Sequence, residues 1–195
     1  MNVTAIIPTL WLRPRLLKRC VTSLAKSNYS PISLFLGHGQ LRYVQTVNKM
    51  LFEIDADFFL LGNDDQEYYP DCIPIAVKAM MENFPDTDGM IGVRQEHGGT
   101  QYAINLLGRK FIHRFPKNAV MCPDYTNYYN DQELCVYARS IDRFRFCEEA
   151  VAIHHMPKDK TRKAMRSTWD KDEKTWEKRQ RLGLLWGKNF TLLNS

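Results

Sequence analysis

The sequence predicts an α/β fold, with a mixed, mainly parallel sheet flanked by helices and a basic helical tail at the C-terminus. Two observations support this prediction. Short apolar runs rich in β-branched residues alternate with segments of helical spacing through the first half of the chain, a pattern typical of parallel sheets covered by helices on both faces. After residue 156, Lys and Arg clearly outnumber Asp and Glu.

Each element is predicted from its local pattern. Val3 to Ile7 is a β-branched run that ends at Pro8-Thr9, and Arg15 to Lys26 has apolar residues at helical spacing after Pro14, a favoured first residue of a helix. The other predicted strands are 32–36, 58–61, 89–93, 144–146 and 150–153. The other predicted helices are 43–52, 73–83, 131–140 and a basic helix after residue 160 with Met165, Trp169 and Trp176 on one face.

Composition indicates a soluble globular protein, with 195 residues of which 44% are hydrophobic and 25% charged. No apolar run approaches the ~20 residues needed to cross a bilayer, and the N-terminus lacks the basic region of a signal peptide. The five cysteines form no C-x-x-C pair, which favours reduced thiols over a zinc site or disulfides. We therefore expect a cytoplasmic protein, with peripheral attachment to a membrane left open.

The net charge of +5 is unevenly distributed. Residues 1–156 carry 16 Lys and Arg against 17 Asp and Glu, whereas residues 157–195 carry 11 against 5. A basic tail favours anionic partners such as nucleotide phosphates, nucleic acid or a membrane surface, and does not choose among them.

Two adjacent carboxylates, Asp64 and Asp65, end the apolar run Leu60-Leu61-Gly62-Asn63. The carboxyl ends of strands are where open α/β sheets bind ligands. Adjacent carboxylates repel each other unless a cation or hydrogen-bond donors hold them. A divalent metal with a phosphate on its far side suits this pair, because hard cations take oxygen ligands. A solvated turn is the alternative interpretation.

Four segments carry a resemblance to a known family. They are Ile6-Ile7-Pro8-Thr9 with Arg13 and the helix end Val21-Thr22-Ser23-Leu24; Gln45 with Asn48; Asn63-Asp64-Asp65 with Pro70; and Asn130-Asp131-Gln132-Glu133-Leu134 with Ala138-Arg139, Phe144 and the run from Ala150 to His155. In this order, over residues 3 to 157, they resemble the inverting GT-A glycosyltransferases of the family 2 type, which transfer a sugar from a nucleotide diphosphate to a hydroxyl acceptor.

The resemblance implies a role for each matched residue. Asp65 is implied as the metal ligand and Asp131 as the catalytic base. His154 or His155, with His154 favoured, is implied as a second contributor to the metal site, and the cofactor is Mn²⁺ or Mg²⁺. The residues implied to contact the nucleotide are Pro8, Thr9, Arg13, Asn48 and Asp64.

The sequence departs from the family pattern in three places. Asn63 and Asn130 stand where the family has an acidic residue, and the stretch from Leu36 to Gln40 lacks the Asp that usually holds the base or ribose. The donor implied is a nucleotide-diphosphate sugar, with a UDP-sugar expected first. The acceptor is a saccharide or a lipid-linked saccharide, with DNA left open by the basic tail.

Two other classes of function stay open. One is a catalytically silent protein that binds a nucleotide sugar; the other is a nucleotidyltransferase, although Thr9-Leu10-Trp11-Leu12-Arg13 lacks the Gly-rich loop expected there. We expect residues 1–157 to form the catalytic domain, and residues 158–195 to form a helical tail that packs on it or closes over the donor.

Several residues keep a structural interpretation beside the functional one. Asp131 has a helix N-cap as its alternative role, and Glu133 is expected at the surface or beside a site residue. The tyrosines 125, 128 and 129 are equally suited to a sugar cleft and to covering the core, and Gly98-Gly99 suits either an acceptor loop or a turn. Trp169 and Trp176 are expected to dock the tail.

Overall fold

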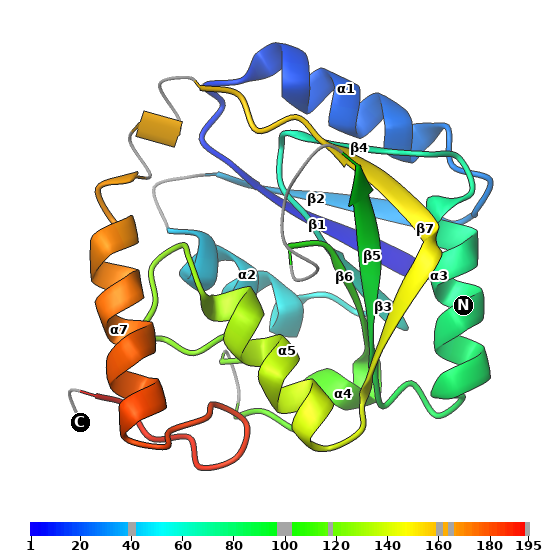
Figure 1. Cartoon of the computed structure of the whole chain (residues 1–195). Coiled ribbons are helices and arrows are strands. Elements are labelled where there is room, and N and C mark those ends of the chain that lie inside the picture. Colours follow the sequence, from blue (N-terminus) through cyan, green and yellow to red (C-terminus); the bar gives the residue numbers. More distant parts are fainter. Residues whose placement is uncertain (39–41, 97–102, 117–118, 159–161, 164–165, 194–195) are drawn as a thin grey trace.

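The computed structural model describes residues 1–38, 42–96, 103–116, 119–158, 162–163 and 166–193. Its centre is a seven-stranded sheet in the order β2-β1-β3-β6-β5-β7-β4 (Figure 1). The strands are β1 (Val3–Thr9), β2 (Ile32–His38), β3 (Phe58–Leu61), β4 (Gln66–Tyr68), β5 (Met90–Glu96), β6 (Asn105–Gly108) and β7 (Phe144–His154).

The sheet is mixed and mainly parallel, as predicted. β1 pairs in parallel with β2 and β3, and β5 pairs in parallel with β7. β6 is antiparallel to both β3 and β5, so these two strands point the same way, and edge strand β4 is antiparallel to β7. The carboxyl ends of β1, β3, β5 and β7 therefore lie along one edge of the sheet.

β7 is one irregular strand, where the sequence predicted two. Its pairing with β5 shifts after Cys147, and Arg94 Nε donates to Glu148 O at 2.9 Å across the irregularity. The pair Glu148-Glu149 breaks the apolar pattern because both side chains lie in this bulge, where they need not be buried.

Helices cover both faces of the sheet. α1 (Pro14–Ala25) and α3 (Cys72–Asn83) contribute to one apolar cluster, and α2 (Tyr43–Glu53) and α5 (Asn130–Ser140) contribute to the other. The alternation of β1 separates the two clusters, since Ile6 joins one while Val3, Ala5 and Ile7 join the other. α4 (Arg109–Ile112) is a single short turn after β6.

The tail packs on the body through its helix α7 (Trp169–Arg181), which lies at the left of Figure 1. Trp176 stacks on Tyr129 with ring centroids 6.2 Å apart, and the Trp169 ring lies 5.4 Å from the same tyrosine. Both tryptophans thus hold the tail on the body, as expected. Residues 162, 163 and 166 are also helical, but a turn at 167–168 separates them from α7, and Met165 lies outside the described residues.

A buried ion pair fixes the tail. Arg179, which is fully buried, donates from Nε and Nη2 to the Glu133 carboxylate at 2.9 Å, and from Nη1 to Asp124 at 2.7 Å. Tyr125 Oη and the Trp186 backbone N–H also donate to Glu133, each at 2.6 Å. The expectation that Glu133 lies at the surface is therefore wrong, because its charge anchors residues from the far end of the chain.

Among the described residues, no helix combines the length and apolar character needed to cross a bilayer.

We predict that Arg179→Met lowers the free energy of unfolding by about 3–5 kcal/mol, because it leaves the buried Glu133 and the partly buried Asp124 without their cation. Urea denaturation followed by circular dichroism measures the change. Lys178→Met removes an exposed charge from the same helix and should stay within about 0.5 kcal/mol of the parent. Equal losses in both variants would mean that apolar contacts alone dock α7.

Candidate active site

The predicted site residues gather where three strands end. Thr9 is the last residue of β1, Asp64 and Asp65 follow β3, and His154 is the last residue of β7. Arg13 comes from the loop between β1 and α1. The topology brings these five residues together because parallel strands present their carboxyl ends at a common edge.

Asp64 and Asp65 are both buried, with 4% and 5% of their surface exposed, and a net of donors holds them. Thr9 Oγ1 donates to Asp64 Oδ2 at 2.7 Å. Arg13 Nη1 lies 2.7 Å from Asp65 Oδ2 and 3.3 Å from Asp64 Oδ1, so one guanidinium faces both carboxylates. The solvated-turn interpretation is therefore wrong.

Gly62 makes room for this arrangement. A Cβ at Gly62 would meet the Tyr68 hydroxyl at 2.2 Å and Gln66 Oε1 at 2.8 Å. Gln66 Oε1 in turn accepts from the Asn63 backbone N–H at 2.9 Å. The chain turns tightly here, which places both carboxylates at the sheet edge directly after β3.

The pKa values of the two carboxylates are shifted in opposite directions. Burial raises the pKa of Asp64, and the hydrogen bond from Thr9 only partly offsets this effect. Burial also acts to raise the pKa of Asp65, but the hydrogen bond and charge of His154, together with the charge of Arg13, outweigh it and hold that pKa below its usual value. Asp65 is thus kept as an anion.

His154 faces Asp65 with a defined ring orientation. Its Nδ1 lies 2.8 Å from Gln95 Oε1, an acceptor, so Nδ1 carries the proton in the neutral ring. Its Nε2 lies 3.3 Å from Asp65 Oδ1. A neutral Nε2 and a carboxylate oxygen are both acceptors, so this contact needs a cation or a proton between the two atoms.

His155 points to the other side of the strand, as alternation requires. Its Nε2 lies 3.0 Å from Glu67 Oε2 and 3.3 Å from Arg19 Nη1. His155 therefore belongs to a separate polar group, and His154 is the histidine that lies against Asp65.

Asp65 and His154 fit a divalent metal as a pair of protein ligands. Two atoms bound at about 2.1 Å and at right angles on one ion are about 3 Å apart, close to the observed separation. The Gln95 contact to the second ring nitrogen is the support that metal-bound histidines usually have. No group of three such ligands occurs among the described residues, so further ligands would have to come from a bound substrate or solvent.

Asp131 lies in the first turn of α5, near the same edge. Tyr129 occupies the N-cap position in a left-handed conformation, with φ of 62°, so the N-cap interpretation of Asp131 is wrong. Burial raises the pKa of Asp131, and the nearby charge of His154 partly offsets this.

Side chains from α7 and α5 hold the loop before α5 in place. Asp172 of α7, which is fully buried, accepts backbone N–H groups from Thr126 at 3.0 Å, Asn127 at 2.8 Å and Tyr128 at 2.9 Å. Asn130 donates from Nδ2 to Asn127 O at 2.8 Å. The tail thus fixes the loop that leads directly to Asp131.

Asn48 stands apart from this cluster. It is buried on α2, where its amide donates to Met121 O and accepts from Met121 N–H, each at 2.8 Å. This pairing secures residue 121 in the segment before α5. Its predicted contact with a nucleotide, like that of the partly buried Pro8, stays a prediction.

The sequence-based predictions assign no role to Trp11 or Gln95, which the structure places in or near the site. Trp11 has a φ of 58° and is 47% exposed, and its backbone N–H donates to Thr9 Oγ1 at 3.0 Å. Gln95 orients His154, and Tyr128 lies within the electrostatic reach of Arg13, Arg162 and Arg166. Positive φ values and contacts across strands leave no pattern in a sequence, which is why Trp11 and Gln95 were missed.

All three tyrosines make structural contacts, and a place for any of them in a sugar cleft stays a prediction. Tyr125 is buried on Glu133, whereas Tyr128 and Tyr129 pack on Trp169 with centroids 4.6 and 5.4 Å away. Gly98 and Gly99 lie outside the described residues.

No protein-family model matches the sequence, and no curated protein matches it significantly. Solved structures do resemble the fold. The mannosyltransferase PcManGT from Pyrobaculum calidifontis, in complex with GDP-Man and Mn²⁺, has a TM-score of 0.61 at 15% identity, over 81% of this chain and 58% of that one. S. aureus TarS 1–349 has a TM-score of 0.57 at 12% identity, over 88% and 65%.

This chain covers a larger share of a third structure. Glucosyl-3-phosphoglycerate synthase from Mycobacterium tuberculosis, in complex with Mn²⁺, UDP and glucosyl-3-phosphoglycerate, has a TM-score of 0.60 at 10% identity, over 94% of this chain and 80% of that one. This chain spans less than two thirds of the length of the first two structures. The predicted GT-A fold is thereby confirmed; at these identities the likeness concerns the fold alone.

We predict that Arg13→Gln lowers the free energy of unfolding by about 1.5–3 kcal/mol at neutral pH, because it removes the cation facing both carboxylates. Arg13 acts to lower the pKa of both Asp64 and Asp65, so its contribution is present while both carboxylates are ionised. It is lost as the pH falls, first through the raised folded-state pKa of Asp64 and then through the lowered pKa of Asp65, which lies below the ordinary value of about 3.9. Urea denaturation at several pH values should show the difference from the parent shrinking in acid. A constant difference would contradict the electrostatic role.

Proposed function

We propose that this protein is a metal-dependent, inverting glycosyltransferase that moves a sugar from a nucleotide-diphosphate sugar to an acceptor hydroxyl. The observation that carries the proposal is that Asp65 Oδ1 and His154 Nε2 lie 3.3 Å apart at the carboxyl edge of a GT-A sheet. Gln95 Oε1 accepts from Nδ1, so in the neutral ring the Nε2 lone pair would face Asp65 and could bind a cation, which would take the place of a proton shared between His154 and Asp65.

Asp65 and His154 would hold Mn²⁺ or Mg²⁺, with the imidazole leaning toward Mn²⁺. The metal supplies charge stabilisation for the departing diphosphate. Arg13 stands beside both carboxylates and is placed to bind phosphate oxygens as a fork of donors. Thr9 and Asp64, with Pro8 and Asn48 as further predicted contacts, would hold the nucleotide portion.

Asp131 is the proposed general base. Its raised pKa suits a carboxylate that must take a proton from an acceptor hydroxyl, because a base is most effective when its pKa approaches the working pH. The hydroxyl gives its proton to an Asp131 carboxylate oxygen while its own oxygen forms the new glycosidic bond. Attack on the face opposite the diphosphate inverts the anomeric carbon.

The donor and acceptor are proposed at the level of chemical class. The structures with this fold bind GDP-Man, UDP-GlcNAc or UDP, which supports a nucleotide-sugar donor, and a UDP-sugar is our first choice. The acceptor is proposed to be a saccharide or a lipid-linked saccharide. We further propose that residues 1–157 form the catalytic unit, and that the tail borders the donor through Arg162 and Arg166, whose charges act on Tyr128 beside Arg13.

The proposal is tested by incubating the protein with UDP, GDP, TDP and CDP sugars and Mn²⁺, and measuring nucleoside diphosphate release. We expect release from one donor, its loss in Asp65→Asn, and a fall of about 10²–10⁴-fold in Asp131→Asn. Asp142→Asn, an acid in the turn after α5, should keep full activity and serves as the control.

The outcomes separate the competing functions. Pyrophosphate release in place of nucleoside diphosphate release would support a nucleotidyltransferase. Binding of a nucleotide sugar without turnover would leave a silent binding protein.

We predict an acidic limb in the pH profile of kcat/KM with an apparent pKa above the ordinary value of about 3.9 for Asp. Burial raises the pKa of Asp131, so the base becomes protonated, and activity falls, at a higher pH than an exposed carboxylate would require. Initial rates at low substrate concentration from about pH 4 to 8 give this profile. A rate that stays flat down to about pH 4 would exclude Asp131 as the base.

A further inference from the structure

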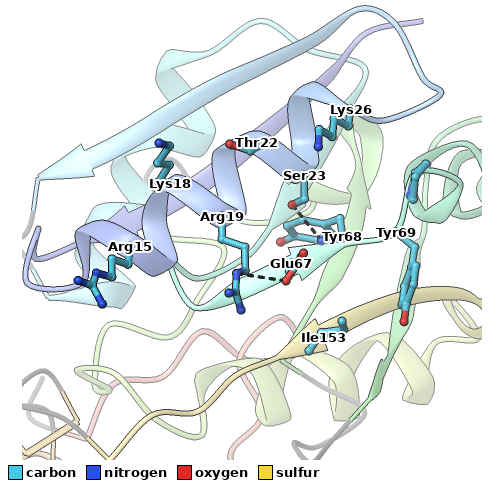
Figure 2. A pocket seen from close by; sticks show the side chains of 11 residues that line it. Arg15, Lys18, Arg19, Thr22, Ser23, Lys26, Glu67, Tyr68, Tyr69 and Ile153 are labelled. Atoms are coloured by element: carbon cyan, nitrogen blue, oxygen red, sulfur yellow. Dashed lines mark hydrogen bonds and ion pairs between the residues drawn. The ribbon is translucent and has the colours of Figure 1, made fainter.

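A groove between α1 and the end of β7 is separate from the carboxylate cluster. It has a volume of about 440 Å³ and lies between α1, the β4 segment that continues to Pro70, and the end of β7. Figure 2 shows α1 along one side of this groove, with Tyr69 and Ile153 on the other.

The charge of the groove is strongly positive. It is lined by Arg15, Lys18, Arg19 and Lys26, against the single carboxylate of Glu67. Three of these residues fall on one side of the helix, because 15, 19 and 26 follow helical spacing. In Figure 2, Arg15 and Arg19 extend together from the side of α1 that faces β7.

Most of this positive charge has no partner. The side chains of Arg15, Lys18 and Lys26 have no hydrogen bond or ion pair within the part of the chain that the structure describes. Glu67 is already engaged, since its Oε2 lies 3.6 Å from Arg19 Nε and 3.0 Å from His155 Nε2. Glu67 therefore positions Arg19 and leaves the net positive charge of the groove available to a ligand.

The opposite end of the groove is uncharged and partly apolar. Tyr69 is 44% exposed, and its hydroxyl is tied to Glu96 Oε2 at 3.0 Å, which leaves the ring as its free surface. Pro70 and Ile153 add apolar surface beside it. An aromatic face next to fixed cations suits a ligand that has an anionic end and a larger uncharged body.

We propose that this groove binds a phosphate-bearing molecule of about the size of a sugar phosphate, with the phosphate on Arg15 and Arg19 and the uncharged body against Tyr69. Arginine forks match phosphate oxygens in pairs. The volume falls within the range of about 300–1,000 Å³ of pockets for small organic ligands, which is more than a bare ion needs. The same phosphate chemistry is present in soluble sugar phosphates and in phospholipid headgroups, and neither source depends on the proposed transfer reaction.

The test is a titration of ¹⁵N-labelled protein with glucose 6-phosphate or inorganic phosphate, followed by amide chemical shifts. A sedimentation assay uses vesicles of phosphatidylcholine and phosphatidylglycerol in equal parts. We expect glucose 6-phosphate to shift amides of 15–26 and 67–70, and Arg15→Gln/Arg19→Gln to weaken its binding at least about tenfold. The control Lys78→Gln/Lys174→Gln removes two exposed charges from other helices and should bind as the parent does.

Each outcome decides the proposal. Groove shifts with glucose 6-phosphate support a soluble ligand, and sedimentation with vesicles that is lost in the arginine variant supports a headgroup. Shifts confined to residues 9–13 and 62–65 would assign the phosphate to the carboxylate site and overturn the proposal. So would equal losses in the arginine and lysine variants, or inorganic phosphate binding as tightly as glucose 6-phosphate.

Discussion

The burial of two neighbouring carboxylates at the end of β3 is the constraint on which the site depends. Asp64 and Asp65 have little exposure, so their charges must be met by donors from other parts of the chain. Thr9 and Arg13 supply donors from the loop after β1, and His154 approaches from β7. The three segments are far apart in sequence, and this shared charge is one reason they converge.

The position of Asp131 depends on a second buried charge system. Arg179 joins Glu133 of α5 to Asp124, and Asp172 accepts three backbone N–H groups from the loop before α5. Both residues belong to α7, so the tail fixes the first turn of α5 from two sides. A tail that acted solely as a solvated basic segment would have no reason to bury an arginine and an aspartate completely.

The sequence allowed the fold, and the convergence of the candidate site residues at one edge of the sheet, to be predicted because both follow local patterns. Alternating strands and helices define the sheet, and paired carboxylates after a buried run mark its functional edge. Short elements such as β4 and β6 were missed because their pairing depends on distant strands. The burial of Glu133 was missed for a similar reason: its partner Arg179 lies 46 residues away, and a charged residue on a helix is usually exposed.

The irregularity in β7 explains why His154, and not His155, faces Asp65. Val93 pairs with Cys147, yet the next residue Arg94 pairs with Val151, so one step along β5 corresponds to four along β7. The excess of three residues is odd, and an odd excess exchanges the faces of every later side chain relative to the partner strand. A regular β7 would have turned the last histidines the other way. The bulge therefore sets which imidazole meets the buried carboxylates and which joins Glu67 and Arg19 beside the groove on α1.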